Sequence, residues 1–573
     1  MKKIFFVFIW TLILSAISFS QESFIFPLKE SRELSSIFAD LRDFHFHSGI
    51  DFRTGEKTGL EVYAVKSGWV YRLFASWWGY GKAIYLKHPD GQITLYAHLS
   101  DYSEKLKKIV TTEQLKNKRY RADIFPQDTI WIEQGELIGY SGETGTGEPH
   151  FHFEIRDKDN KPLNPLTSGF PLPDTIPPVF TSLGIRALDV NSYVDDSTEI
   201  KMYPLQFDST QKVYVSKEIP VVEGNVGIEI SAYDQMAEKG SRFGIYKLEL
   251  FLDSLLVFSS HYDTIDFENS WKIELDRDFG LMKKREGEFY KLYLDYGNDL
   301  PLYSTTNRGF LEFLDSGIHK LEILAFDASG NISKSKIIVK AIRPRIYEGL
   351  RTDIPRLFMT ANQDKITSQS KDGLAKVEID SGSVFRNINV QVNKLDSHKM
   401  AREKSSYYSF LPSDVPLAKP AKISICCTSS KCRLAKTGLY EYVDSTYKFT
   451  GHEIDTANNS ISAEVRDLST YVLLEDRTAP EIREVHPKPR QEINVKDVNI
   501  SARVTDDLSG IGSDQDIQVY LDGEWQIPEY DPEKCILISR PQKPISPGWH
   551  KLAIRAKDRM GNQKTIRIRF KAI

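Results

Sequence analysis

The stretch PHFHFEIR, residues 149–156, alternates aromatic or aliphatic side chains with polar ones. Such alternation is typical of a β-strand, in which residues i and i+2 lie on the same face. His150 and His152 are therefore expected to point into the same space. If one imidazole binds a metal ion, the other lies beside the open coordination position, where it can transfer a proton or polarise a carbonyl group.

Two further motifs supply groups of the same chemistry. HSGID, residues 47–51, places His47 and Asp51 four residues apart, and Gly49 allows a bend that turns both side chains toward one ion. TLYAHL, residues 94–99, is another strand-like run and carries His98 near its end. Catalytic zinc usually takes three protein ligands from His, Asp or Glu and leaves a fourth position to water or substrate. A single histidine is more often structural, but this combination predicts a hydrolytic zinc site.

The histidines are also unevenly distributed. Of 12 histidines in the chain, six lie between positions 45 and 152. His45 and His88 fit neither the ligand nor the catalytic role and are interpreted as structural, with His45 a candidate for orienting a ligand.

These motifs, together with the glycine-rich stretch GELIGYSGETGTGEPHFHFEIRD at residues 135–157, resemble the lysostaphin-type or LytM-like zinc metallopeptidases. Members of this family cut peptide crosslinks in bacterial cell walls, and the resemblance covers about residues 24–170. It implies an antiparallel β-sheet peptidase domain with zinc as cofactor. By this resemblance the zinc ligands are His47, Asp51 and His152, and the catalytic histidines are His98 and His150.

The chain departs from the family pattern in the loops beside the expected cleft. Ala39 stands where the family usually has glycine, and GTGEP, residues 145–149, is shorter than the usual loop before the paired histidines. Both departures concern substrate contacts rather than the metal site. An insertion at about residues 101–135 begins with a predicted helix. The basic residues of this helix are interpreted as a solvent-exposed face, and the alternative is that they form a wall of the substrate-binding site. Trp77, Trp78 and Tyr80 are candidates for either the groove or the core.

The N-terminus predicts export. Lys2 and Lys3 precede an apolar run and then small residues, so residues 1–20 are interpreted as a cleavable signal peptide. No later stretch is apolar enough to span a bilayer, and the mature protein is expected in the periplasm, the cell envelope or the medium. The formal net charge of −4 gives no reason to propose nucleic acid as a partner. Of the four cysteines, Cys432 is predicted to form a disulfide with Cys426 or Cys427, and Cys535 lies apart.

The rest of the 573 residues is predicted to form β-sandwich domains. A repeat supports this, because residues 317–341 align without a gap on residues 548–572 and each copy resembles a β-hairpin closed by Gly-Asn. The predicted domains are a peptidase domain (21–172), an immunoglobulin-like domain (173–343), a β-rich domain of uncertain type (344–475) and a second immunoglobulin-like domain (476–573). Each is expected to have its own core, so residues 21–172 are expected to fold alone.

Aspartates in these β-domains raise the question of calcium. Calcium could be bound by Asp234, Asp506, Asp507 and Asp522, but no dense ligand loop of a known kind surrounds them. They are interpreted as turn-forming carboxylates.

The function predicted from all of this is an exported zinc endopeptidase that acts on peptidoglycan crosslinks, with β-domains that bind partners in the envelope. Two alternatives are kept. One is a non-catalytic envelope scaffold or activator, which the complete ligand set argues against. The other is a secreted peptidase that attacks non-wall proteins or a competitor's wall.

Overall fold

The computed structural model describes residues 23–42, 45–127, 129–189, 191–344, 364–385, 388–396, 400–429 and 432–573. The predicted signal peptide lies outside these ranges. Strands make up most of the regular structure, which confirms the prediction of a mainly β protein. Within the described ranges, no helix is both long and apolar enough to cross a membrane.

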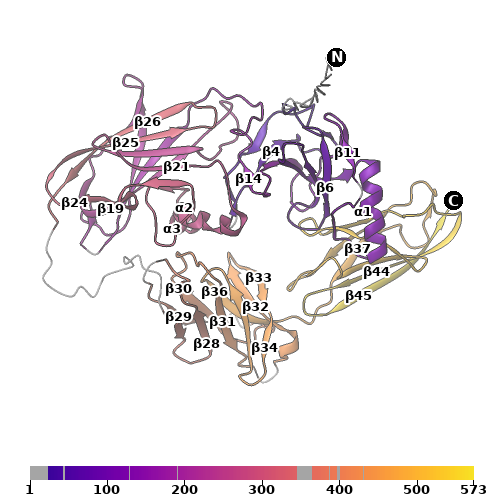
Figure 1. The fold of residues 1–573 in the computed structure, drawn as a ribbon. Helices are drawn as coiled ribbons and strands as arrows, with labels where there is room; N and C mark the ends of the chain where they lie inside the picture. The colour runs from indigo at the N-terminus through magenta and orange to yellow at the C-terminus, as the bar shows by residue number, and fades with distance from the viewer. Residues whose placement is uncertain are drawn as a thin grey trace, which may run out of the picture.

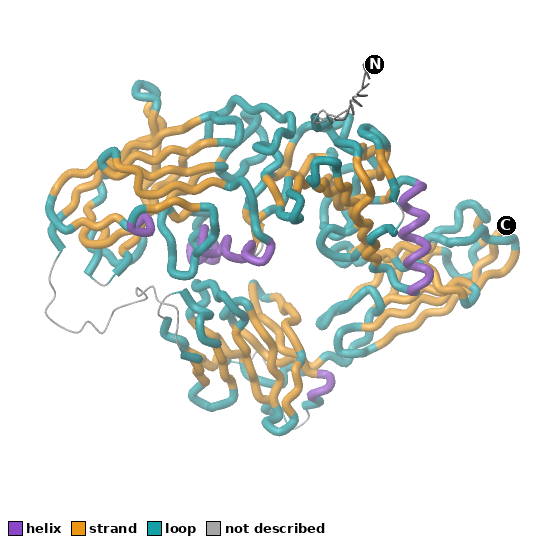
Figure 2. The backbone as a smooth tube through the Cα atoms, viewed as in Figure 1, coloured by secondary structure: helices purple, strands orange, loops and turns teal. Residues whose placement is uncertain are grey.

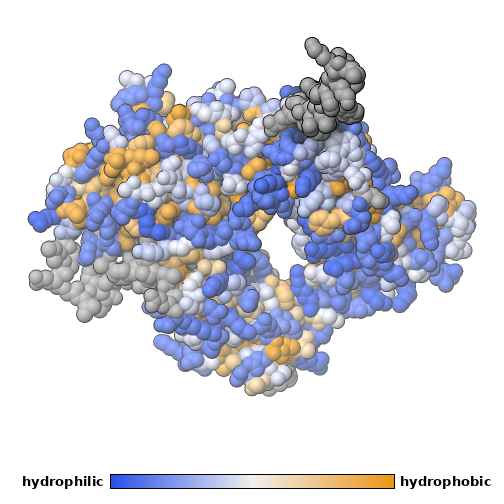
Figure 3. Space-filling model, in the orientation of Figure 1, coloured by the Kyte–Doolittle hydropathy of each residue, from blue (hydrophilic) through white to orange (hydrophobic). Residues whose placement is uncertain are grey.

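Four parts follow one another around a central opening (Figure 1, Figure 2). We name them by the predicted ranges: the N-terminal domain (21–172), the second domain (173–343), the third domain (344–475) and the C-terminal domain (476–573). The N-terminal domain, in indigo and purple, and the C-terminal domain, in yellow, lie side by side, so the chain closes on itself. The space-filling view in Figure 3 shows that side chains leave the opening unfilled.

The N-terminal domain is built on a sheet of order β1-β4-β13-β8-β7-β6-β10, with β11 paired to β6 and β14 paired to β13. β13 (His150–Arg156) lies between β4 (Ile50–Arg53) and β8 (Ile93–Leu99) and is antiparallel to both. The other strands of this sheet are β1 (Leu34–Ser36), β6 (Gly68–Ala75), β7 (Lys82–Lys87), β10 (Ala122–Ile124), β11 (Trp131–Ile132) and β14 (Pro162–Leu163). A small sheet consists of β5 (Glu61–Tyr63), β12 (Leu137–Tyr140) and β9 (Asp101–Tyr102). A separate pair is formed by β2 (Leu41–Arg42) and β3 (His45–Phe46).

The insertion contains the predicted helix, α1 (Glu104–Asn117). It buries Leu106, Val110 and Gln114 against the domain and ends at Lys118, which adopts a left-handed conformation with φ 46°. β10 and β11 then return the chain to the edge of the main sheet.

The second domain forms a sheet of order β16-β19-β15-β17-β18-β26-β25-β20-β21-β23, with β22 and β24 paired to β19. Its strands are β15 (Val179–Ala187), β16 (Tyr193–Val194), β17 (Lys201–Asp208), β18 (Val213–Ser216), β19 (Val221–Tyr233), β20 (Lys247–Leu252), β21 (Leu255–His261), β22 (Tyr290–Lys291), β23 (Tyr303–Thr305), β24 (Leu311–Phe313), β25 (Gly317–Phe326) and β26 (Ile332–Ala341). Short helical segments lie between β21 and β24, namely η1 (Phe267–Lys272), α2 (Ile273–Asp276), α3 (Phe279–Lys283) and η2 (Asn307–Gly309).

The third domain packs two five-stranded sheets, β27-β28-β31-β35-β34 and β29-β30-β36-β32-β33. Its elements are β27 (Ile366–Gln369), β28 (Ala375–Ile379), β29 (Gln391–Leu395), β30 (Tyr407–Leu411), β31 (Ala421–Cys426), η3 (Leu434–Lys436), β32 (Thr437–Val443), β33 (Thr446–Gly451), β34 (Glu453–Asp455), β35 (Ser460–Val465) and β36 (Thr470–Glu475). Cys427 and Cys432 form the disulfide, which confirms the prediction for Cys432 and selects its partner.

The C-terminal domain packs a sheet of order β37-β39-β43-β42 against one of order β38-β45-β44-β40-β41. Its strands are β37 (Glu481–His486), β38 (Glu492–Ile493), β39 (Ile500–Thr505), β40 (Ile517–Leu521), β41 (Glu524–Gln526), β42 (Glu529–Asp531), β43 (Ile536–Ser539), β44 (Gly548–Lys557) and β45 (Gln563–Ala572). β25 pairs with β26, and β44 with β45, along their full length, so both predicted hairpins are confirmed. The immunoglobulin-like type of the two domains stays a prediction.

Hydrophobic cores cross two of the domain boundaries. Trp77 and Tyr120 of the N-terminal domain are 3% and 2% exposed and belong to the apolar cluster of the C-terminal domain. Phe38, Ala39 and Phe46 belong to the cluster of the second domain. The expectation that each domain has a core entirely of its own is therefore wrong at these two interfaces.

Polar contacts reinforce the same interfaces. The Trp77 indole N–H donates to the Pro528 carbonyl at 3.2 Å, and Arg119 at the end of the insertion donates to Asp514 at 2.9 Å. The Gly244 amide of the second domain donates to Asp40 at 2.7 Å. Arg119, predicted to be solvated, is thus part of a domain interface.

Candidate metal centre

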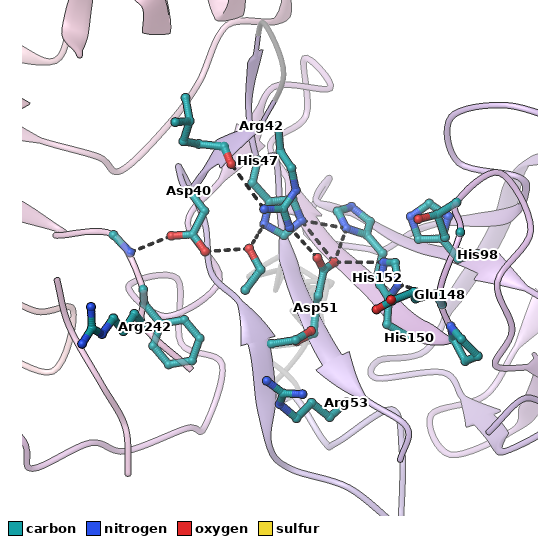
Figure 4. A pocket seen from close by; sticks show the side chains of 18 of the residues that line it. Asp40, Arg42, His47, Asp51, Arg53, His98, Glu148, His150, His152 and Arg242 are labelled. Atoms are coloured by element: carbon teal, nitrogen blue, oxygen red, sulfur yellow. Dashed lines mark hydrogen bonds and ion pairs between the residues drawn. The ribbon is translucent and has the colours of Figure 1, made fainter. Parts of the chain in front are cut away.

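A cavity of about 2280 Å³ opens over the face of the main sheet where β4, β13 and β8 lie together. Most of its wall comes from the N-terminal domain. The second domain adds Arg242, Phe267 and Glu288, and the C-terminal domain adds Glu533 and Lys534. All five histidine and aspartate residues of the predicted site line this cavity, and Figure 4 shows them together.

Three predicted ligands converge at the floor of the cavity (Figure 4). His47 Nε2 lies 3.0 Å from His152 Nδ1 and 3.1 Å from Asp51 Oδ1. His152 Nδ1 lies 2.8 Å from the same Asp51 oxygen. Pairing of β13 with β4 sets this geometry, because His152 stands directly opposite Asp51 in the antiparallel register.

The three atoms fit a zinc ion. Tetrahedral zinc with bonds of about 2.0–2.2 Å separates its ligand atoms by about 3.3–3.6 Å, slightly more than the 2.8–3.1 Å seen here. The Nδ1–H of His47 donates to the Ile37 carbonyl at 2.7 Å, which leaves Nε2 with its lone pair toward the other two groups. Burial alone would raise the pKa of Asp51, but the neighbouring imidazoles hold it well below its usual value, so this group is a carboxylate.

The structural role of Gly49 differs from the predicted one. Its backbone has no positive φ, so the bend at HSGID does not need glycine for its conformation. A Cβ atom at this position would lie 2.3 Å from the Phe153 carbonyl oxygen and 2.8 Å from Glu154 Cγ. Glycine is needed here because the chain that carries His47 passes directly against β13.

Ala39, unlike Gly49, occupies a position whose backbone conformation favours glycine. It adopts φ 64°, the left-handed region that favours glycine, which accounts for glycine in the family pattern. Its amide donates to the His47 carbonyl at 2.8 Å, and its methyl group is 4% exposed within the second domain's core. Burial of the methyl group offsets part of the conformational cost of alanine.

His98 and His150 lie next to each other beside the three ligands. Their ring centroids are 4.7 Å apart, and the His150 Nε2 is 3.8 Å from Asp51 Oδ1. The Nδ1–H of His98 donates to the Thr144 carbonyl at 3.0 Å, and that of His150 donates to the Glu148 carbonyl at 2.9 Å. Both rings therefore keep Nε2 unprotonated.

Electrostatics keeps both imidazoles neutral. Burial, followed by the charges of His150 and His152, lowers the pKa of His98 to about 3. Burial also lowers the pKa of His150. A neutral imidazole can accept a proton, which is the property that a general base needs.

A polar network behind the site was not predicted. Glu154 accepts a hydrogen bond from His152 Nε2 at 2.9 Å and also from Arg156, Ser48 and Tyr80, each at 2.7 Å. Burial would raise the pKa of Glu154, but Arg156 and His152 hold it far below its usual value. The same alternation that placed His150 and His152 on one face continues to Glu154 and Arg156, so this signal was present in the sequence.

Two further contacts to the predicted ligands were not assigned from the sequence. Arg42 donates to the outer oxygen of Asp51 at 2.8 Å. The Asp40 carboxylate accepts a hydrogen bond from the Ser36 hydroxyl at 2.6 Å. The same Ser36 oxygen lies 3.2 Å from His47 Nδ1. Both come from the segment before HSGID, and their approach depends on the pairing of β1 with β4 and of β2 with β3.

The remaining predictions have mixed outcomes. His88 is buried and bonded to the Ser67 carbonyl and to Thr94, as a structural histidine would be. His45 is exposed at the cavity wall. Of the three aromatic residues, Tyr80 lines the cavity, whereas Trp77 is buried at the C-terminal domain and Trp78 is 49% exposed. The lysines of the insertion do not line the cavity within the described residues.

With this geometry in place, comparison with known proteins identifies the domain. A sequence profile described as "Peptidase family M23" matches residues 45–115. The chain contains an M23 peptidase domain. The matched residues include the first two ligands and His98.

Curated relatives match part of the chain. The DD-carboxypeptidase/endopeptidase Mpg of Neisseria meningitidis serogroup B and that of Neisseria gonorrhoeae are each 32% identical over 136 residues. The match covers 23% of this chain and 25% of each relative, so most of both chains lies outside it.

Solved structures are similar to part of the chain. The catalytic domain of the prophage-encoded M23 protein EnpA from Enterococcus faecalis is 24% identical, with 26% of this chain and 98% of that chain covered and a TM-score of 0.19. A zinc-containing peptidase from Vibrio cholerae is 25% identical, with 25% and 39% covered and a TM-score of 0.19.

Proposed function

We propose that this protein is an exported zinc endopeptidase that hydrolyses peptide crosslinks of bacterial peptidoglycan. The observation that carries the proposal is the convergence of His47, Asp51 and His152 beside two neutral imidazoles in one open cavity. In this proposal the three residues hold the ion, and His98 and His150 are catalytic. The export signal predicted at residues 1–20 would place the enzyme in the periplasm, the cell envelope or the medium, where its substrate is found.

When bound, zinc would supply a Lewis acid that lowers the pKa of water and polarises the scissile carbonyl. The chain's own groups provide proton transfer. His98 and His150 present unprotonated Nε2 atoms, because the carbonyls of Thr144 and Glu148 fix their tautomers. One imidazole accepts a proton from the attacking water. The resulting cation can then donate a hydrogen bond to the oxyanion or a proton to the leaving amine.

Removal of the ion tests the zinc assignment. The purified protein should bind about one zinc per chain and cleave crosslinked muropeptides, and a chelator should abolish cleavage that added zinc restores. His47→Ala, Asp51→Ala and His152→Ala should each sharply weaken zinc binding in elemental analysis. Full zinc occupancy in all three variants would contradict the ligand assignment.

The catalytic assignment needs variants that keep the metal. His98→Ala and His150→Ala should retain zinc yet lose about a hundredfold or more in turnover, the size expected for positioned proton-transfer groups. His261→Ala, an exposed histidine of the second domain, serves as the control and should keep full activity. Loss of zinc in either test variant would show that a ligand had been mistaken for a catalytic residue. Zinc-loaded protein without cleavage of any muropeptide would favour the scaffold alternative.

A further inference from the structure

Two groups of three aspartates lie outside the proposed zinc ligands, one group in each domain of the internal repeat. Within each group, one carboxylate oxygen per residue lies within 4.8 Å of the others. The first group, in the second domain, consists of Asp174, Asp234 and Asp327. The second group, in the C-terminal domain, consists of Asp476, Asp506 and Asp558.

The two groups occupy equivalent places in the repeat. Each begins with an aspartate in the segment that leads into its domain, Asp174 in DTIPPV and Asp476 in DRTAPE. The second aspartate follows a strand, β19 or β39, and the third opens the turn of the terminal hairpin. The repeated aspartates thus come together from three separate segments of each domain.

An asparagine fixes this arrangement in the same way in both domains. Asn331 donates to the carbonyl of Asp174 at 3.1 Å and to the side chain of Asp327. Asn562 donates to the carbonyl of Asp476 at 3.1 Å and to the side chain of Asp558 at 2.8 Å. The Gly-Asn of the repeated turn therefore ties the leading segment to the hairpin.

Oxygens of these carboxylates are buried without a partner. Asp234 is 2% exposed, and its Oδ1 has no hydrogen-bond partner among the described residues. In the described part of the chain the same holds for Asp174 Oδ2 and Asp506 Oδ1. An unpaired buried carboxylate oxygen is costly, so each of these atoms needs an explanation.

A residue from a neighbouring domain points to the same conclusion at the second group. Tyr440, on β32 of the third domain, is 0% exposed, and its hydroxyl group also lacks a hydrogen-bond partner within the described residues. Its pKa is raised by burial and then by the charges of Asp476, Asp506 and Asp558.

Basic side chains do not neutralise the groups. Among the described residues, no Lys or Arg nitrogen forms an ion pair within 4.0 Å of any of the six carboxylates. Lys436 comes near the second group, but its ammonium donates to the Met560 carbonyl at 2.6 Å and to Asn562 at 2.8 Å. Burial, followed by the charges of Asp327 and Asp174, raises the pKa of Asp234 to about 7, as expected for like charges without a counter-ion.

We propose that each group of aspartates binds one calcium ion. Carboxylates, backbone carbonyls and a phenol are hard oxygen ligands, and calcium accepts six to eight of them in irregular geometry, whereas magnesium needs a near-ideal octahedron with several waters. Asp174 follows the M23 domain directly, and Asp476 follows the third domain directly. The ions therefore fix how each repeat domain is joined to the domain before it. The proposal does not depend on peptidase activity.

Calcium titration of the full-length, zinc-loaded protein tests this. Isothermal titration calorimetry should show about two calcium ions per chain, and calcium should raise the melting temperature as a ligand of the folded state does. Asp234→Asn and Asp506→Asn should each reduce the number of ions from two to one. Asp497→Asn, an exposed carboxylate of the C-terminal domain, should keep both ions.

The asparagine variants also separate ion binding from a structural role. Each removes one of three like charges at nearly constant shape, so the melting temperature without calcium should stay the same or rise, and the increase on adding calcium should shrink. A lower melting temperature without calcium, together with two ions still bound, would overturn the proposal. Absence of calcium binding to the wild-type protein, or a clear preference for magnesium, would also overturn it.

Discussion

At the scale of single residues, the proposed metal site is supported by Glu154, a carboxylate that the sequence motifs did not assign to the site. Glu154 is fully buried and holds His152 through Nε2, while Arg156 holds Glu154. Carboxylates that bond to a ligating histidine fix its tautomer and ring orientation and raise its basicity as a ligand. The position of Glu154 therefore bears on zinc affinity.

Glu154→Gln should lower zinc affinity by about 10-fold or more, in the range typical for groups that support metal ligands. Glutamine removes the negative charge, and its amide would face the donating Arg156. Competition with a chromogenic zinc chelator measures the change. Glu56→Gln, an exposed change at the cavity rim, is the matched control and should leave affinity unchanged. Equal zinc affinities for the two variants would contradict the supporting role proposed for Glu154.

Sequence patterns could indicate the ligands but not all of their neighbours. His150, His152 and Glu154 lie on one face because of strand periodicity, which is a local property. His47 and Asp51 are close in sequence, so one bend brings them together. Arg42 and Asp40 reach the site only through tertiary packing of β1 and β2, and no local pattern records that packing.

At the scale of elements, the strands with local partners were predictable. Both repeated hairpins pair neighbouring segments across a short turn, and alternation with Gly-Asn indicated them. The neighbours of β13 were not predictable, because β4 precedes it by about a hundred residues and alternation does not specify a distant partner. The insertion helix was indicated by its sequence, but the contact of Arg119 with Asp514 was not.

β19 carries a buried acid whose titration should affect stability. Glu229 is 0% exposed and accepts hydrogen bonds from Arg186 at 2.7 Å and Tyr293 at 2.8 Å. Burial raises its pKa from 4.5 to about 7, although Arg186 opposes this shift. Between pH 4.5 and about pH 7, Glu229 therefore binds more protons in the folded protein than in the unfolded chain. Stability from this group is therefore present at low pH and falls as pH rises toward 7.

Glu229→Gln should remove this pH dependence. Between pH 5 and pH 8 the melting temperature of the wild type should fall relative to that of the variant, with a free-energy difference of at most about 3 kcal/mol. Differential scanning calorimetry at the two pH values measures the change. Glu218→Gln, at an exposed turn of the same domain, is the control and should follow the wild type. A parallel pH response of Glu229→Gln and wild type would contradict the argument.

At the scale of the whole molecule, the ring of domains bears on the cavity itself. Lys534 of the C-terminal domain forms an ion pair with Glu143 in the loop before the paired histidines. Arg242 of the second domain lies at another side of the cavity, as Figure 4 shows. Separate domains were predicted from the strand pattern and the internal repeat, but their mutual docking was not, because it depends on polar residues such as Asp40 and Lys82 meeting distant partners.

This docking leads to a different expectation for the M23 domain alone. A truncated variant of residues 21–172 keeps every proposed zinc ligand but would expose Trp77 and Tyr120 on one side and Phe38 and Phe46 on the other. Burial of a large apolar side chain contributes roughly 1.5–3 kcal/mol, and several such losses are comparable with the whole stability of a domain, about 5–15 kcal/mol. The truncated variant should therefore melt well below the full-length protein and bind a hydrophobic dye.

Polar replacements test why the truncated variant is unstable. They distinguish the exposure of apolar interface residues from a more general requirement for the other domains. Trp77→Gln and Phe46→Gln, introduced together into the truncated variant, should reduce dye binding and aggregation, because both side chains pack mainly in neighbouring cores. In the full-length protein the same pair should lower the melting temperature, because each leaves a polar group in an apolar cluster. Zinc stoichiometry should stay near one in every folded form, since all three proposed ligands remain. A truncated variant that melts like the full-length protein without these replacements would show that the shared cores contribute little, and that the domains are independent units after all.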